Sequence, residues 1–129
     1  MESDIDTTKK LTEAGISVVG HLIFGLPVET KEMMLESFKR MLACGINGYK
    51  IHPLHIVKNT KLAVMYEKEA FKLLELDEYI ALIKEVFSLT PKDCVVHRVG
   101  ADVPNKETLV APAWALDKNL INNLLNEYF

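Results

Sequence analysis

The chain has 129 residues, of which 49% are hydrophobic and 26% are charged, and its formal net charge is −3. This composition is typical of one globular domain, and a chain of this size buries about two-thirds of its surface on folding. The 15 Lys and Arg residues form no cluster, so binding to nucleic acid or to an anionic membrane mainly through charge is not expected. The apolar runs are too short for a membrane span and the first residues are polar, which predicts a cytoplasmic protein.

The cysteines and histidines do not form a metal-binding pattern. Cys44 and Cys94 are far apart and have no neighbouring cysteine, so both are predicted to be small buried apolar residues. Of the four histidines, only His52 and His55 are close in sequence. In a strand, their spacing would place the two rings on opposite faces. No metal ligand is therefore predicted in this chain.

The hydrophobic pattern alternates between helical and extended periods. The predicted elements, in chain order, are a helix at 7–14 capped by Asp6, a strand at 16–24, a helix at 31–44 capped by Thr30, a strand at 49–56, a helix at 62–74, a helix that begins after Asp77 and stops before Pro91, and a strand at 94–99. The first strand is nearly continuously apolar, which is typical of a strand buried on both faces. The second is interrupted by Pro53, which cannot donate to a ladder.

Strands separated by helices need crossover connections, so the fold class is α/β with a parallel sheet and right-handed units. Residues 1–99 hold the predicted βα units. Residues 100–129 form a C-terminal extension, with an irregular stretch and a final amphipathic helix that carries Leu120, Ile121, Leu124 and Leu125. Three strands complete neither an eight-stranded barrel nor a doubly wound sheet, which indicates part of a larger fold.

Ligands of parallel α/β folds collect at the carboxyl ends of the strands. The loops expected there are 25–30, 52–55 and 98–100. A glycine directly after a buried strand lets the backbone approach a ligand closely, and the following proline stiffens the path to the next helix. The same Gly25-Leu26-Pro27 sequence is also compatible with a plain tight turn.

Two motifs carry a resemblance to a known family. His-Leu-Ile-Phe-Gly-Leu-Pro-Val-Glu-Thr at 21–30 is followed by Gly-Tyr-Lys-Ile-His-Pro-Leu-His-Ile-Val-Lys-Asn-Thr at 48–60. Together they resemble the C-terminal part of radical SAM proteins, in the bacterial branch related to the elongator catalytic subunit and to oxygen-independent coproporphyrinogen oxidase. The resemblance extends over roughly residues 5 to 115 and includes the Thr108-Leu-Val-Ala-Pro112 segment.

The resemblance implies the C-terminal portion of a partial (β/α) barrel that binds S-adenosylmethionine. In that family a 4Fe-4S cluster reduces the cofactor, and the resulting 5′-deoxyadenosyl radical takes hydrogen from a substrate. The positions that correspond to the two walls of its adenine site are Ile23, Phe24, Gly25 and Leu26 on one side and His52, Pro53 and Leu54 on the other.

The sequence also departs from the family pattern. His21 stands where the family has glycine, and the glutamate of the family motif falls one place late, at Glu29. The CxxxCxxC loop that holds the cluster is absent. The expectation is therefore a C-terminal fragment of a radical SAM enzyme of unknown substrate, inactive alone, without catalytic residues of its own and without tight cofactor binding.

Strand parity supplies candidates for the substrate cavity. Lys50 and His52 share one face of their strand, and Val19, His21 and Ile23 share one face of theirs. If those faces point inward, His21, Lys50 and His52 are neighbours of the substrate or the cofactor. His55 and Arg98 are further candidates for the substrate cavity. For each histidine, a partly buried and hydrogen-bonded structural role is the favoured alternative. A buried lysine needs a charge partner or a ligand, and the arginine suits a carboxylate or another anion.

Two other classes of function remain open. One is a non-catalytic binding or oligomerisation module that uses Trp114 and the final helix. The other, ranked third, is a phosphate-ligand enzyme that uses the helix N-terminus after Thr30. The partners expected are the missing N-terminal half of the barrel and, because an incomplete barrel leaves a sheet edge unpaired, further copies of the chain. Neither a membrane nor nucleic acid is expected as a partner.

Overall fold

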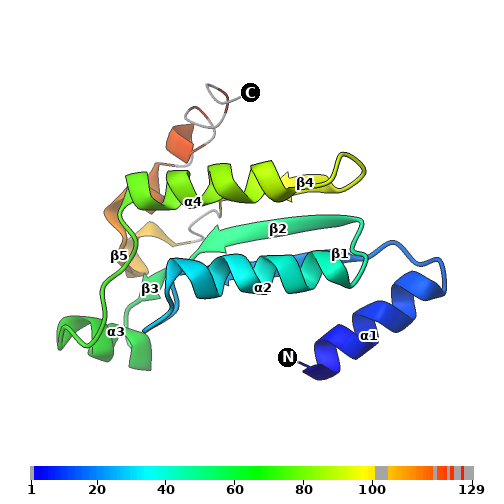
Figure 1. Ribbon diagram of the computed structural model, residues 1–129. Helices are drawn as coiled ribbons and strands as arrows, with labels where there is room; N and C mark the ends of the chain where they lie inside the picture. The colour runs from blue at the N-terminus through cyan, green and yellow to red at the C-terminus, as the bar shows by residue number, and fades with distance from the viewer. Residues whose placement is uncertain (1, 101–104, 118, 122, 124–125, 127–129) are drawn as a thin grey trace.

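The computed structural model describes residues 2–100, 105–117, 119–121, 123 and 126. Its elements in chain order are α1 (Glu2–Glu13), β1 (Val19–Phe24), α2 (Lys31–Ala43), β2 (Gly48–Pro53), β3 (Ile56–Val57), α3 (Lys61–Glu67), α4 (Leu76–Leu89), β4 (Val95–Arg98) and β5 (Leu109–Ala111), with short 3-10 helices at Lys106–Thr108 and Ala113–Leu116 (Figure 1).

The main sheet is parallel, with strand order β1-β2-β4, which confirms the predicted α/β class. Val19 of β1 pairs with Gly48 of β2, and the register continues without a break to Phe24 and Pro53. The pairing of β2 with β4 shifts between Tyr49 and Lys50. A second sheet of two strands, β3 and β5, is antiparallel.

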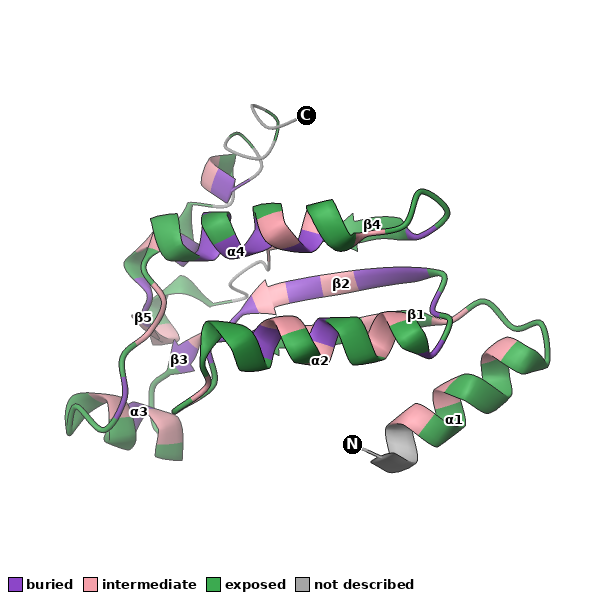
Figure 2. Ribbon diagram, in the orientation of Figure 1, coloured by how far each residue is buried: buried purple, intermediate pink, exposed green. Residues whose placement is uncertain are grey.

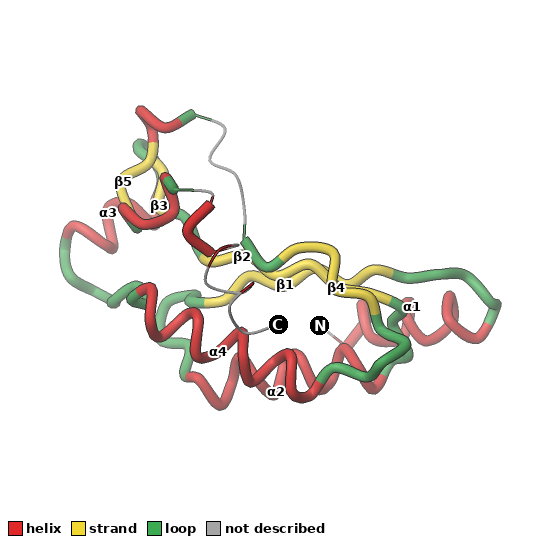
Figure 3. The backbone as a smooth tube through the Cα atoms, turned by 90° about the horizontal axis from the view of Figure 1, so that it is seen from above, coloured by secondary structure: helices red, strands yellow, loops and turns green. Residues whose placement is uncertain are grey.

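Both long crossover helices pack on the same face of the main sheet. In Figure 3, α2 and α4 lie together on one side of β1, β2 and β4. This follows from the strand order, because right-handed crossovers that advance in one direction place successive helices on one face. The core between them contains Phe24, Phe38, Tyr49, Ile51 and Tyr79, and the buried residues of the strands and helices meet there (Figure 2).

Aromatic contacts connect the core to the ends of the elements. Phe38 and Tyr49 meet edge to face at 4.9 Å, and the Tyr49 hydroxyl lies 2.7 Å from that of Thr90 at the end of α4. Burial raises the pKa of Tyr49 to about 12. Tyr79 stacks on Trp114 and donates a hydrogen bond to the Val99 carbonyl. The C-terminal extension is thereby attached to the same core as the sheet.

Some helix boundaries confirm the capping predictions and others correct them. Thr30 caps α2, since its side chain accepts from the Met33 N–H. The prediction for Asp77 was wrong, because Glu75 is the N-cap of α4 and forms a capping box with Glu78. That reciprocal pair satisfies two backbone amide groups at the start of the helix. Asp77 lies two residues later, inside the first turn of α4, and is therefore not at the N-cap position.

The first and third helices also differ from expectation. The first begins at Glu2, so Asp6 lies inside α1 rather than at its N-cap. The predicted helix at 62–74 ends at Glu67. Glu69 has a φ of 56°, a left-handed conformation that stops helical propagation.

Two strand predictions need correction. Residues 16–24 are not buried on both faces: the strand begins at Val19, and Ile23 is 45% exposed. The apolar run arises because one face meets the helices while the other face still carries aliphatic residues. The predicted strand at 49–56 is divided in two, since Leu54 and His55 separate β2 from β3.

The short antiparallel sheet packs with α3 into a second, smaller cluster. Its buried residues are Leu54, Ile56, Ala63, Phe71 and Ala111. Part of the predicted extension therefore pairs with the chain after β2. Of the predicted final helix, Ile121 is buried against the main core, whereas Leu124 and Leu125 lie outside the described residues.

Among the described helices, none is long and apolar enough to cross a bilayer. The predicted cytoplasmic location stays a prediction.

The Tyr79 hydroxyl provides a test of the packing between α4 and the end of β4. Tyr79→Phe leaves the buried Val99 carbonyl without that donor, so we expect the free energy of unfolding to fall by about 1–3 kcal/mol, measured by urea denaturation. The control is Tyr66→Phe, in a half-buried ring without a described hydroxyl hydrogen bond, for which we expect a change within about 0.5 kcal/mol. Equal losses in the two variants would contradict the assignment.

Candidate functional site

The face of the main sheet opposite α2 and α4 carries most of the polar side chains of the strands. The register pairs His21 with Lys50 and Ile23 with His52, so these four residues lie next to one another on one face. The alternate residues of each strand lie on the helical face, where Phe24 and Ile51 are buried. We call the surface formed by Val19, His21, Ile23, Gly48, Lys50, His52, His97 and Arg98 the open face.

The strand β4 adds two further basic groups to the open face. Arg98 pairs with Lys50 in the register, across the shift that follows Tyr49. The imidazole of His97 lies over Gly48, because a Cβ built on that glycine would be only 2.6 Å from Nε2. His97 was not among the site residues predicted from the sequence. A glycine in the central strand, which leaves room for a neighbouring side chain, is the signal that could have found it.

The charges around His52 are positive. Burial lowers the pKa of His52, and the positive charges of His21 and Arg98 lower it further. Burial and the nearby His52 also lower the pKa of His55. His21 and Arg98 are therefore near enough to His52 to affect its charge state, and His52 is near enough to His55 to do the same. His55 lies in the loop between β2 and β3, so strand parity, on which the predicted opposite faces of His52 and His55 depend, does not apply to it.

The ion pairs of the described residues lie elsewhere. Lys31 contacts Glu85 at 2.5 Å, and Arg40 contacts Glu36 at 3.7 Å, both on the helical side of the molecule. Lys50 is half-buried and forms no ion pair within the described part of the chain. Its cross-strand partners, His21 and Arg98, are both basic.

The predicted adenine-side residues divide into two groups. Ile23 and Leu26 are exposed, and His52 is half-buried on the open face. Phe24, Gly25, Pro53 and Leu54 are buried. The buried four therefore offer a ligand their backbone and not their side chains. Gly25 has a φ of 98°, a conformation that favours glycine, as the predicted loop requires.

Two polar atoms near the carboxyl ends of the strands are buried and have no described hydrogen-bond partner. They are His55 Nε2 and Glu29 Oε1. Glu29 also lines a pocket of about 270 Å³ with Leu26, Phe71 and Lys72. Buried polar atoms are nearly always hydrogen-bonded in complete structures, so both atoms mark places where a further group would fit.

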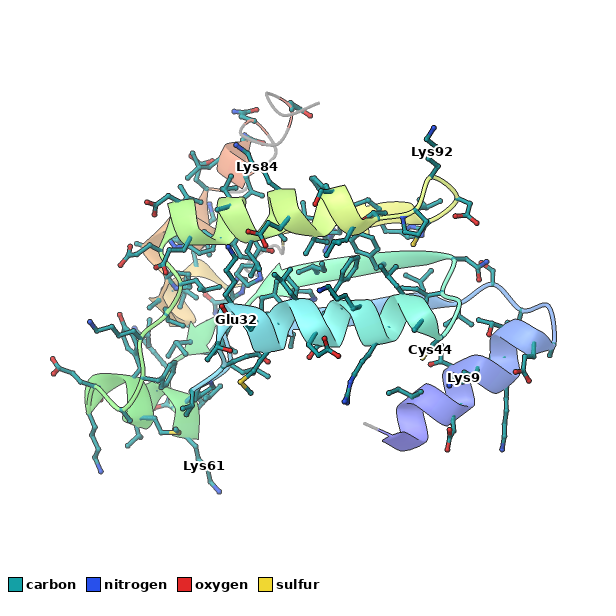
Figure 4. All side chains as sticks on the ribbon, viewed as in Figure 1. Lys9, Glu32, Cys44, Lys61, Lys84 and Lys92 are labelled. Atoms are coloured by element: carbon teal, nitrogen blue, oxygen red, sulfur yellow. The ribbon has the colours of Figure 1, made fainter. Side chains whose placement is uncertain are left out.

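The cysteines do not fit an iron-sulfur cluster. Both are buried, as predicted, and burial raises the pKa of Cys94. Cys44 lies at the end of α2 beside α1 (Figure 4), where its thiol donates to the Arg40 carbonyl at 3.3 Å. In the described ranges no three Cys, His, Asp or Glu residues could hold a metal ion together. A cluster held by three thiolates therefore does not fit this chain.

The outer edge of β1 lies beside a cleft. The cleft has a volume of about 380 Å³ and is lined by α1, β1 and α2, with Ile5, Gly20 and Met41 among its residues. The Thr12 hydroxyl of α1 donates to the Cys44 carbonyl at 3.0 Å, so α1 is attached at the far end of α2. This geometry leaves the edge of β1 accessible between two helices.

Fold and site define an α/β protein that covers one face of a parallel sheet with helices and presents basic groups on the other. The model of the Radical_SAM C-terminal domain family matches residues 46–129. The chain belongs to this family, which confirms the resemblance seen in its motifs.

Individual relatives agree with this assignment. The chain is 33% identical to YtqA of Bacillus subtilis over 123 residues, which are 95% of this chain and 38% of YtqA. It is 36% identical to YhcC of Escherichia coli over 108 residues, 84% of this chain and 35% of YhcC. The solved structure of Elp3 from Methanocaldococcus infernus, with its N-terminus deleted, superposes with a TM-score of 0.82 at 26% identity and covers 98% of this chain and 30% of that one.

The chain thus spans 38% of the length of YtqA, 35% of YhcC and 30% of the Elp3 chain. Membership in a radical SAM family implies that S-adenosylmethionine and a 4Fe-4S cluster are the cofactors of a full-length parent protein.

The electrostatic environment of His52 can be tested by removing one charge. Arg98→Met removes a positive neighbour, so the protonated imidazole becomes easier to form and we expect the pKa of His52 to rise, measured by NMR titration of the histidine ring signals. Arg40→Met, on the helical side, serves as the matched control and should leave the pKa of His52 unchanged. A pKa of His52 that does not move in Arg98→Met would show that the two groups are not neighbours.

Proposed function

We propose that this chain forms one wall of the cavity of a radical SAM enzyme, with its open face toward the cofactor and the substrate. The observation that carries this proposal is the composition of the open face. It combines exposed aliphatic residues with a half-buried lysine and several imidazoles, and it extends to the carboxyl ends of the parallel strands, where α/β proteins bind ligands. Lys50 is half-buried between two strands, where a ligand or a partner of opposite charge would stabilise its ammonium group.

The relatives have further sequence outside the matched region. A segment of that kind would supply the remaining strands of the barrel. The edge of β1 suits the addition of a parallel strand, because its backbone groups are unpaired on that side in the described sheet. The cleft beside that edge offers apolar walls from α1 and α2. The predicted N-terminal half of the barrel is thus proposed as the principal partner.

Bound S-adenosylmethionine supplies the group from which the family generates its radical. In this chain, Ile23 and Leu26 provide exposed apolar surface for an adenine ring, with the His52 ring beside Ile23. The buried Phe24, Pro53 and Leu54 hold the ends of β1 and β2 in position beneath that surface. The thiolates for a cluster would come from the other part of the protein, since the two cysteines here are buried and separate.

A chimeric protein tests this proposal. We would replace the matched segment of YtqA with this chain and measure S-adenosylmethionine affinity anaerobically by equilibrium dialysis. Ile23→Asp places a carboxylate on the proposed adenine surface, and we expect affinity to fall at least ten-fold.

The matched control is Met33→Asp, a comparably exposed apolar residue on α2, which should leave the affinity unchanged. Equal affinities of the Ile23→Asp and parent chimeras would exclude the proposed adenine surface.

A second candidate function, an oligomerisation module, is favoured by one observation. All four residues of β4 are exposed, and in the described sheet both β1 and β4 are edge strands. Such edges pair with other chains. We expect the 129-residue chain to self-associate at micromolar concentration, measured by light scattering, and the double variant Val19→Lys, Ile23→Lys to dissociate it. The control is Met33→Lys. A monomer at every concentration would contradict this prediction.

A further inference from the structure

The register shift between β2 and β4 determines which side chain faces Lys50. Gly48 pairs with Val95 and Tyr49 with Val96, so an unbroken register would pair Lys50 with His97. The shift pairs Lys50 with Arg98 instead. The strand therefore departs from regular pairing at the point where Arg98 is brought opposite Lys50.

Like charges directly opposite each other in a sheet are destabilising. The sequences of β1, β2 and β4 contain no Asp or Glu that could compensate these charges. The nearest carboxylates in sequence, Glu29 and Asp93, lie beyond the carboxyl end of β1 and before the amino end of β4, and Asp102 lies outside the described residues. Lys50 and Arg98 are therefore two cationic cross-strand neighbours on a surface that otherwise carries imidazoles and aliphatic groups.

The imidazoles around this pair can serve as further donors. His21 is the other cross-strand neighbour of Lys50, and His97 lies over Gly48 at the adjacent position. Burial lowers the pKa of His52, and the charged neighbours that lower it further, His21 and Arg98, are both basic, which agrees with an open face of positive potential. A neutral imidazole still donates one N–H, so the histidines contribute hydrogen bonds at neutral pH.

We propose that Lys50 and Arg98 together bind a compact oxyanion, a phosphate or carboxylate group that belongs to the substrate of the enzyme. The guanidinium group presents a planar fork that matches two oxygens, and the ammonium group adds a point charge beside it. This inference rests on the proposed function, because it assigns a substrate class to the cavity wall described there. It requires no step by the cofactor.

The test uses the 129-residue chain and the NMR signals of its histidine rings. Inorganic phosphate and acetate are titrated separately at constant ionic strength against chloride. We expect saturable shifts of the His21 and His52 signals with one of the two anions, and this anion identifies the source of the oxyanion. In Lys50→Met and in Arg98→Met the dissociation constant should rise at least ten-fold.

Matched variants control for the loss of a charge. Lys39→Met and Arg40→Met each remove one positive charge from α2, on the helical side, and should leave the dissociation constant unchanged. Lys50→Gln provides a second, polar substitution should the methionine variant fail to fold. Shifts that do not saturate, that chloride reproduces, or that persist in the Lys50 and Arg98 variants would overturn the proposal.

A further titration separates the substrate from the cofactor. If S-adenosylmethionine competes with the anion and loses affinity in Lys50→Met, the pair binds the carboxylate of the cofactor, and the assignment to the substrate is wrong. The anion titration needs neither a cluster nor the rest of the barrel. A chain that binds no anion would therefore say nothing about the adenine surface, which Ile23→Asp tests. Equal affinities of the Ile23→Asp and parent chimeras would likewise say nothing about anion binding.

Discussion

The alternation of side chains along β2 is the constraint on which the rest of the structure depends. Tyr49 and Ile51 point to one side, where α2 and α4 pack against them, and Lys50 and His52 point to the other. Because the side-chain period of a strand is two, a slip of one residue would bury the lysine and expose the tyrosine. The same register therefore fixes the core and the open face, and neither can change without the other.

Periodicity and capping predicted most of this arrangement. The three main strands and α2 lie close to their predicted positions, because each has a strong local signal in its apolar pattern and, for α2, in Thr30. The end of α3 was not predictable in this way. Residues after Glu67 continue an apolar pattern, but those residues pack into the smaller cluster around Phe71 instead of extending the helix. Tertiary contacts decided that boundary.

For the site, parity correctly grouped His21 with Lys50 and His52, because all three lie on strands in uninterrupted register. Parity could not place Arg98. A regular β4 would have put His97 opposite Lys50, and only the paired strands show the shift that puts Arg98 there. The exposure of Ile23 could not be predicted from the sequence either, since an apolar strand in a parallel sheet is normally covered on both faces. In the described part of the chain, helices cover only one face of β1.

The two faces of the sheet differ in what they do for stability. The helical face supplies the buried aromatic and aliphatic contacts, together with the hydrogen bonds of Tyr49 and Tyr79. The open face, by contrast, places Lys50 beside Arg98 and leaves Ile23 in contact with water. Such features lower the stability of the isolated chain. Features that oppose stability in one local region are expected at functional sites, where a ligand or a partner supplies the missing interactions. The chemistry of the open face therefore indicates what it lacks: apolar cover for the aliphatic residues and negative charge for the cations.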